Sequence, residues 1–393
     1  MYTGKTVFSQ IINHAPRRHF HGLVEKYKGN FRAHKFSCWD QFLCMSFAQL
    51  TYRNGLRDIE ACLKAQPRKL YHMGIHGNPS KNNIANANLN RNWRIYAEFA
   101  HILIAQAREL YQDEDPFSIV LDNTVYALDS TTIDLCLSLF PWAKFRKAKG
   151  AVKLHTLLDM KGAIPSCIEI TDGSVHDVNI LDDLTLEPES YYVMDRGYID
   201  FNRLYRIHKN LSFFVIRAKR NFDYRRLYST AIDKASAIWS DQTIKVNGIN
   251  TKKDYPESLR RIRCYDRIND KYLVFLTNSF KLPAAVIAEL YQNRWKIELF
   301  FKWIKQHLRI QKFFGNSLNA VKTQIWIAIS IYVLVAIIKK KYQIQLSLYI
   351  ILQVLSVSLF EKVPLAELLS DEQPSRKFTA GNDQIDMFDF LGH

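Results

Sequence analysis

The chain has 393 residues, of which 48% are hydrophobic and 23% are charged. This composition excludes an intrinsically disordered protein, and the length allows two or three domains with a sizeable core. The formal net charge of +16 predicts a polyanionic partner. Six cysteines occur without a CxxC pair, which predicts free thiols in a reducing cytosol rather than a zinc site or a disulfide framework.

The first 75 residues are basic, with 12 Lys and Arg against 4 Asp and Glu. Apolar residues recur at helical spacing over Trp39–Tyr52, and a second helix is expected over Gly55–Leu63. A compact helical module with a basic face suits duplex DNA, so Arg53 and Arg57 are candidate DNA-binding residues. The alternative is a helical domain whose basic surface is only solvated. A loop rich in turn formers, residues 74–83, then leads to a helix expected near Asn92–Leu110.

From Phe117 onward the pattern becomes strand-like. We expect three antiparallel strands, then a strand ending at Asp195, a helix and a fifth strand. Their expected ranges are Tyr126–Leu135, Val152–Leu158, Ile164–Ile170, a short run up to Asp195, Phe201–Lys209 and Phe213–Ile216. This order is that of a ribonuclease H-like α/β fold with a mixed sheet and helices. In that fold the first and fourth strands bring two acids together, and a later helix supplies a third.

Two aspartates occupy these strand positions. Asp129 lies in the middle of TVYALDSTTIDL, where a carboxylate is costly unless it is paired or bound to a metal ion. Asp195 follows four apolar or aromatic residues in YYVMDRGY, and catalytic groups commonly lie at such strand ends. His176 and Asp177, in TDGSVHD after the third strand, are weaker candidates that either contact DNA or form a turn.

Residues 221–280 separate the fifth strand from the next helix and are expected to form an inserted β subdomain. Three strands are expected there, separated by Asn-Gly and Asn-Asp turns, at Gln242–Val246, Arg260–Tyr265 and Tyr272–Thr277.

A single helix is expected from Ala284 to Phe314, because this stretch contains no Pro or Gly. Four residues of YQNRWKIELFFKWIK would then project from one narrow face: Tyr291, Arg294, Glu298 and Lys305. A carboxylate flanked by basic and hydroxyl groups suits a divalent cation beside a phosphodiester. The alternative is a solvated charged face with a Glu–Lys contact. The upstream aspartates favour a catalytic, metal-binding triad of Asp129, Asp195 and Glu298.

The C-terminal part contains an apolar run of 14 residues, Ile325–Ile338. This run is shorter than a membrane span, so a core helix is expected, and a short membrane anchor is the alternative. A second apolar segment, Leu346–Phe360, precedes a tail that is acidic overall. No secretory signal is visible at the N-terminus, and a cytoplasmic protein with no membrane partner is expected.

The chain resembles DDE transposases of the YREK group, the IS-four type of bacterial insertion sequence. The resemblance rests on LDSTT at 128–132, MDRGY at 194–198, the Tyr291, Arg294, Glu298 and Lys305 set, and ANANLNRNWRIY at 85–96. It implies cut-and-paste transposition through hairpin ends, with two Mg²⁺ ions that Mn²⁺ could replace. The implied partners are double-stranded DNA, as inverted-repeat ends and target, and a second copy in a synaptic homodimer. It also implies a bacterial nucleoid location.

The resemblance assigns further roles to individual residues. Tyr291, Arg294 and Lys305 would hold a phosphate of the terminal strand. Trp239 would stack on an extruded base in the insertion, and its alternative is burial against the insertion strands.

The resulting organisation runs from an α-helical N-terminal DNA-binding domain to a catalytic domain interrupted by the insertion. The expected boundaries are 1–75 for the helical domain, 76–116 for the connection, 117–220 and 281–345 for the catalytic core, 221–280 for the insertion and 346–393 for the C-terminal segment. Three rival functions remain open: an endonuclease on the same fold that cuts without joining, a catalytically silent DNA-binding protein derived from a transposase, and a basic nucleic-acid-binding protein with structural acids.

Overall fold

The computed structural model describes residues 4–114, 116–117, 121–146, 149–232, 237–266, 270–306 and 313–370. Its N-terminal part is helical: α1 (Val7–Ile12), α2 (Arg17–Lys26), α3 (Cys38–Leu50), α4 (Leu56–Lys64), α5 (Pro67–Leu70) and the 3₁₀ turn η1 (Tyr71–Met73). The two helices expected in this part are confirmed. A capping box starts α3, because the Ser37 hydroxyl accepts from the Asp40 N–H while the Asp40 carboxylate accepts from the Ser37 N–H.

The connection contains one helix more than expected. Helix α6 (Lys81–Asn90) precedes the expected helix α7 (Arg94–Tyr111), so the predicted loop ends at residue 80 rather than 83. Asparagines in this stretch favour turns, but Ser80 caps the helix by accepting from the Asn83 N–H, and Ile84 and Ala87 are buried. The cap and the burial together outweigh the weak local propensity.

The five core strands are confirmed as β1 (Val125–Leu135), β3 (Lys149–Asp159), β4 (Ile164–Asp172), β5 (Tyr191–Met194) and β6 (Phe213–Arg217). They lie in the order β4-β3-β1-β5-β6, with β3 antiparallel to β1 and to β4, and with β1, β5 and β6 parallel. The three-residue strand β2 (Lys144–Arg146), which was not predicted, pairs with β3. The intervening short elements are η2 (Asp177–Asn179), α8 (Ile180–Asp183), η3 (Arg196–Tyr198) and α9 (Phe201–Lys209).

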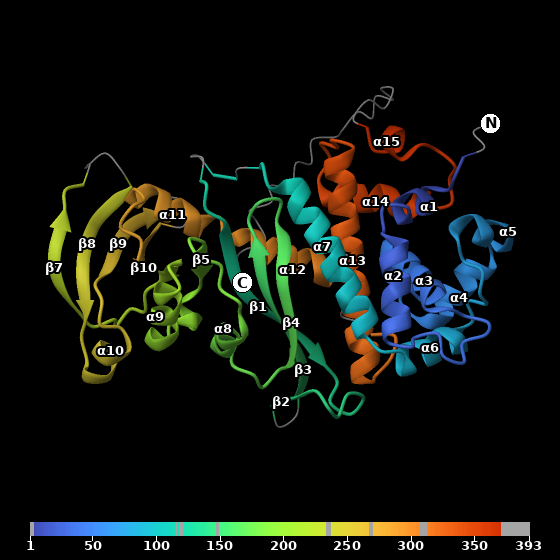
Figure 1. The fold of residues 1–393 in the computed structure, drawn as a ribbon, viewed down its shortest axis with the longest axis horizontal. Coiled ribbons are helices and arrows are strands. Elements are labelled where there is room, and N and C mark those ends of the chain that lie inside the picture. Colours follow the sequence, from blue (N-terminus) through green and yellow to red (C-terminus); the bar gives the residue numbers. More distant parts are fainter. Residues whose placement is uncertain are drawn as a thin grey trace.

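The insertion extends the core sheet rather than forming a sheet of its own. It contains β7 (Tyr224–Thr230), β8 (Ile238–Val246), α10 (Ile249–Asp254), β9 (Leu259–Asp266) and β10 (Lys271–Thr277). Strand β10 pairs antiparallel with β6, so one ten-stranded sheet runs through both parts. In Figure 1 the insertion strands lie at the left, away from the N-terminal helices. The three predicted insertion strands are confirmed, whereas the largely exposed edge strand β7 was missed.

Helices cover both faces of the core sheet. Val125 and Ala127 of β1 join the hydrophobic core that includes residues of α7 and α13, whereas Tyr126 and Leu128 join a second core with residues of α9. This alternation is the period of two expected for a strand that is buried on both faces.

The single helix predicted from Ala284 to Phe314 is wrong. The structure contains α11 (Ala284–Gln292) and α12 (Trp295–Gln306), and residues 307–312 of the prediction lie outside the described residues. Between the helices, the N–H groups of Arg294, Lys296 and Ile297 each donate to the carbonyl three residues back. These tighter turns interrupt the α-helical pattern at Asn293 and Arg294, so the four predicted site residues do not share one continuous helix.

Helix α13 (Leu318–Lys341) lies beside α7, between the N-terminal helices and the sheet (Figure 1). It is long and apolar enough to cross a membrane, but 94% of its most apolar 18-residue window is buried inside the protein. The prediction of a core helix is therefore confirmed. Helices α14 (Leu348–Ser358) and α15 (Leu365–Leu368) follow it.

Candidate active site

Asp129 and Asp195 occupy neighbouring positions on two parallel strands. Strands β1 and β5 pair in register up to Leu128 and Met194, and the two aspartates are the next residues of the chain, Asp129 within β1 and Asp195 just after β5. Neighbouring strands lie about 4.8 Å apart, so this register brings two residues that are 66 positions apart in the sequence side by side, where the pairing of β1 with β5 ends. Asp195 then begins the turn η3.

Arg294 connects Asp129 to Glu298. Its Nη1 donates to Asp129 Oδ2 at 2.7 Å, and its Nη2 donates to Glu298 Oε1 at 2.5 Å. The Arg294 side chain is 15% exposed and that of Asp129 is 23% exposed, whereas Glu298 is 58% exposed. One guanidinium therefore lies between an acid of the sheet and an acid of α12.

Tyr291 contacts the third acid. Its hydroxyl donates to Asp195 Oδ1 at 3.2 Å, and its ring packs on Phe275 of β10. Burial raises the pKa of Tyr291 to about 12, and so the hydroxyl keeps its proton at neutral pH. The Arg294 guanidinium also lies 5.8 Å from the centroid of the Tyr291 ring.

The electrostatics of Asp129 reflect a crowded acidic site. Burial raises the pKa of Asp129, and the carboxylates of Glu298 and Asp195 raise it further. The Arg294 guanidinium and the Ser130 N–H lower that pKa, but they do not fully offset the increase. The ionised form of Asp129 is thus held at a cost that an additional cation would reduce.

Lys305 lies two turns after Glu298 on the same face of α12. Burial lowers the pKa of Lys305, whereas the carboxylate of Asp134 opposes this change. Among the described residues, no ion pair joins Lys305 to Asp129, Asp195 or Glu298.

The donor chemistry of the site fits divalent cations, although the side chains are not arranged around one. Within the described part of the chain, no three His, Cys, Asp or Glu side chains converge as a metal site. Arg294 occupies the space between two of the acids instead. The hydroxyl of Thr156, the β3 residue paired with Asp129, is buried without a hydrogen-bond partner, as is Arg294 Nε. Carboxylates and a hydroxyl are the oxygen donors that Mg²⁺ takes.

Asp177 contacts Ser130, on the face of β1 opposite the Asp129 side chain. His176, the residue before it, is exposed. The Asp177 carboxylate accepts from Ser130 Oγ at 2.7 Å and from Lys153 Nζ at 3.1 Å. Asp177 therefore begins the turn η2, and its carboxylate binds the residue that follows Asp129.

Comparison with protein families identifies the catalytic part. The model of the transposase DDE domain matches residues 121–334, more than half of the chain. The chain belongs to the DDE transposase family. A second model, of a domain of unknown function, matches residues 3–76 of this transposase.

Two proteins with transposase names are similar to this chain in sequence, and one solved structure overlaps with it. A Sinorhizobium fredii protein named transposase y4zB is 31% identical over 294 residues, which cover 74% of this chain and 80% of that protein. A Geobacillus stearothermophilus protein described as a transposase for insertion sequence element IS5377 is 32% identical over 223 residues, covering 55% and 57%. A solved piggyBac transposase synaptic complex with hairpin DNA overlaps 88% of this chain and 79% of that chain, with a TM-score of 0.45 and 10% identity.

Trp239 of this DDE transposase is 55% exposed, so its alternative reading as a buried residue is wrong. The pairing register of β8 with β9 shifts between Ile238 and Ser240, which places Trp239 at a β-bulge. Its ring packs edge-on against Tyr272 at 4.8 Å, and Arg263 lies over both rings.

The two basic candidates of the N-terminal helices differ in their surroundings. Arg53 donates to the Thr51 carbonyl oxygen at 2.9 Å and pairs with Asp58 at 3.4 Å, so it stabilises the connection between α3 and α4. Arg57 is exposed on α4. Of the two, Arg57 is the one whose charge faces solvent.

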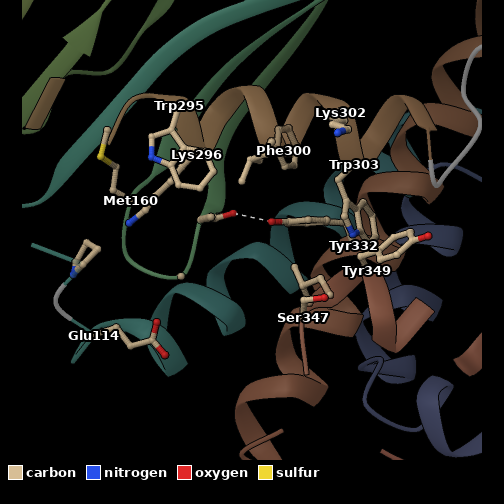
Figure 2. Close-up of a pocket in the computed structure, with 15 residues that line it drawn as sticks. Glu114, Met160, Trp295, Lys296, Phe300, Lys302, Trp303, Tyr332, Ser347 and Tyr349 are labelled. Atoms are coloured by element: carbon tan, nitrogen blue, oxygen red, sulfur yellow. Dashed lines mark hydrogen bonds between the residues drawn. The ribbon is translucent and has the colours of Figure 1, made fainter. Parts of the chain in front are cut away.

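A cavity of about 820 Å³ lies on a different face of α12 from Glu298. Figure 2 shows its lining, which includes Trp295, Phe300 and Trp303 of α12 together with Tyr332 of α13 and Tyr349 of α14. The dashed line in Figure 2 joins the Tyr332 hydroxyl to the Ala163 carbonyl oxygen at 2.9 Å. Its lining is largely apolar and includes none of the three acids.

Sequence reasoning missed several residues around Asp129. Thr156 and Lys153 could be found only from the pairing of β1 with β3, which no local pattern fixes. Tyr198 has a buried hydroxyl without a hydrogen-bond partner, and burial followed by the Asp129 and Asp177 charges raises its pKa. This tyrosine belongs to the MDRGY motif, and that motif was the available signal.

Proposed function

We propose that the protein is a YREK-group transposase of the IS-four type, which binds the inverted-repeat ends of an insertion sequence. It cleaves and joins DNA strands by a metal-dependent, cut-and-paste reaction that passes through hairpin ends. The observation that carries this proposal is the placement of Asp129 and Asp195 directly after the last paired residues of β1 and β5, with Arg294 connecting Asp129 to Glu298.

The strand order supports a ribonuclease H-like catalytic domain. Three antiparallel strands are followed by two that are parallel to the first, and α12 brings Glu298 to the first strand. The proposed domain division keeps the boundaries predicted from the sequence, with residues 221–280 as an insertion that lengthens the catalytic sheet.

In the proposed site, Asp129, Asp195 and Glu298 would hold two Mg²⁺ ions, which Mn²⁺ could replace. Such ions activate the attacking oxygen and stabilise the leaving oxygen in phosphodiester displacement. The raised pKa of Asp129 and the Arg294 ion pairs support a site built for positive charge. The remaining polar groups orient the DNA.

Arg294, Tyr291 and Lys305 would hold a phosphate of the terminal strand. A guanidinium binds a phosphate through two parallel hydrogen bonds, whereas a lysine acts as a point charge. In the free protein Arg294 and Tyr291 bind the acids instead. Binding of a terminal phosphate would therefore require Arg294 to exchange carboxylate partners for phosphate oxygens.

The proposed partners are the transposon ends and the target DNA, and two copies of the chain would pair in the synaptic complex. The net charge of +16 supports a DNA partner, and the basic N-terminal helices with Arg53 and Arg57 supply one binding surface. A cytoplasmic protein that acts at the bacterial nucleoid is consistent with this function.

Strand joining distinguishes the proposed transposase from an endonuclease on the same fold. We expect the purified chain to join a pre-cut inverted-repeat end to a target duplex when Mg²⁺ is present, and to lose this activity when EDTA is added. The measurement follows a labelled end into a longer product on a denaturing gel. Cleavage without joining would support the endonuclease, and DNA binding without either reaction would support a silent derivative.

Replacement of Trp239 tests its proposed stacking on an extruded base. Stacking contributes about 1–3 kcal/mol per base, so Trp239→Ala should weaken binding to a hairpin end with an unpaired base by roughly 5- to 150-fold. Trp239→Phe should retain most of that affinity, as measured by fluorescence anisotropy. Tyr228→Ala is the control, because Tyr228 is an exposed aromatic residue of the same insertion. Equal affinity of Trp239→Ala and the wild type would exclude this role.

A further inference from the structure

Three polar side chains from β1 and β3 converge on one oxygen of Asp177. Ser130 Oγ lies 2.7 Å from Asp177 Oδ1, Lys153 Nζ lies 3.1 Å away, and His155 Nδ1 lies 3.8 Å away. We refer to Ser130, Lys153, His155 and Asp177 as the Asp177 cluster. Because side chains alternate along a strand, this cluster lies on the face of the sheet opposite Asp129.

The cluster is held firmly by the sheet. Ser130 pairs with His155 in the β1–β3 register, and Lys153, two residues before His155 in β3, lies on the same face. The side chains of His155 and Lys153 are 0% and 13% exposed. Lys153 also donates to the Val175 carbonyl oxygen at 2.7 Å, which fixes the loop before Asp177. Hydrogen bonds between ionised groups in such partly buried surroundings are stronger than those in water.

The cluster is connected to two of the acids. Ser130 donates its backbone N–H to Asp129 Oδ1 at 2.8 Å while its hydroxyl donates to Asp177. Asp177 also begins η2, and η2 packs against η3, the turn that follows Asp195. A replacement of Asp177 would therefore alter the position of the Asp129 carboxylate through Ser130. It would also alter the backbone at Asp195 through the packing of η2 against η3.

We propose that Asp177 is a positioning residue that orients the Asp129 carboxylate through Ser130. This inference rests on the proposed function, since the oriented carboxylate is the one that would hold the divalent ion. Residues that orient metal-binding carboxylates by hydrogen bonds typically contribute 10- to 100-fold to metal affinity or activity. The role differs from both sequence-based readings of Asp177, which were a DNA contact and a turn.

The test measures Mn²⁺ binding to the full chain without DNA, by the loss of the free-Mn²⁺ electron paramagnetic resonance signal. Asp177→Asn keeps the shape but gives the Ser130 hydroxyl a neutral, weaker acceptor in place of the carboxylate, and it should weaken Mn²⁺ binding about tenfold. Its thermal unfolding midpoint should fall, because the largely buried Lys153 loses its charged partner, and Mn²⁺ binding is therefore measured at a temperature well below that midpoint. The matched control is Asp183→Asn, which removes one charge from an exposed aspartate of α8. This control should bind Mn²⁺ like the wild type.

Ser130→Ala provides the second arm and keeps the test decisive if Asp177→Asn folds poorly. It should weaken Mn²⁺ binding to a similar degree, and the double variant should be no weaker than the weaker single variant, because both changes interrupt one connection. Unchanged Mn²⁺ affinity in Asp177→Asn, or additive effects in the double variant, would overturn the inference. Asp129→Asn is titrated in parallel: if Mn²⁺ binding is the same with and without the Asp129 carboxylate, the proposed metal site itself fails.

Discussion

Asp129→Asn is expected to reduce strand cleavage by at least about a thousandfold while leaving DNA binding nearly unchanged, and Asp195→Asn and Glu298→Gln should do the same. The physical reason is that phosphodiester displacement needs negatively charged oxygen ligands for divalent ions, and an amide cannot supply the charge. Each replacement keeps the size of the side chain. The measurement compares cleavage of a labelled end with binding of the same DNA by gel shift.

Asp122→Asn is the control for this series. Asp122 is exposed and lies seven residues before Asp129, outside the pairs that involve Arg294. Its replacement should leave both cleavage and binding at the wild-type level. Retained cleavage in any one of the three active-site variants would remove that residue from the proposed triad, whereas loss of DNA binding would indicate that the replacement disturbed the fold.

Asp129→Asn is expected to destabilise the fold no more than Arg294→Ala does, as measured by urea unfolding at neutral pH. Because the folded state raises the pKa of Asp129 above its ordinary value, the folded protein binds this proton more tightly than the unfolded chain does. The contribution of Asp129 to the free energy of unfolding therefore increases as the pH falls through the folded pKa, and the ionised carboxylate destabilises the fold at neutral pH. The neutral asparagine removes this unfavourable charge, and it also removes the ion pair with Arg294. A destabilisation much larger than that of Arg294→Ala would contradict this account.

The strands of the core could be predicted from sequence because their apolar residues alternate or run continuously, and turns separate them clearly. Their pairing register could not be predicted. A shift by two residues keeps every side chain on its original face, so the pattern in β1 does not show that Thr156 lies opposite Asp129. The β-bulge at Trp239 is hidden for the same reason, since it depends on how β8 meets β9.

The break between α11 and α12 shows a second limit of the sequence. No Pro or Gly marks it, and Asn293 at the break is only a weak signal among residues that mostly favour a helix. The structure instead turns at Arg294, whose side chain pairs with Asp129, 165 residues away in the sequence. The structure brings Tyr291, Arg294 and Glu298 to the two aspartates, but the arrangement that places Arg294 between two acids depends on a contact that no local pattern contains.

Arg294→Ala is expected to weaken capture of the terminal strand and to slow strand joining by about 10- to 100-fold, which corresponds to the loss of one charge-assisted contact of 1.5–3 kcal/mol. Arg294→Lys should recover only part of the loss, because a lysine cannot bind a phosphate with two parallel hydrogen bonds. Fluorescence anisotropy with a pre-cut end measures capture, and the joining assay measures the rate. Unchanged capture and joining in Arg294→Ala would contradict the phosphate role.

The same variant should also lose about 1–3 kcal/mol of stability in the absence of DNA, since removing one partner leaves the partly buried Asp129 carboxylate beside two other acids. Without the guanidinium, the folded pKa of Asp129 rises further, so the deficit should shrink as the pH falls through that pKa. Urea unfolding at several pH values measures this. In the double variant Asp129→Asn/Arg294→Ala, the two effects should not add, because both replacements break the same ion pair. Additive losses would show that Arg294 stabilises the free protein through other contacts, and a deficit independent of pH would show that the Asp129 charge is not its cause.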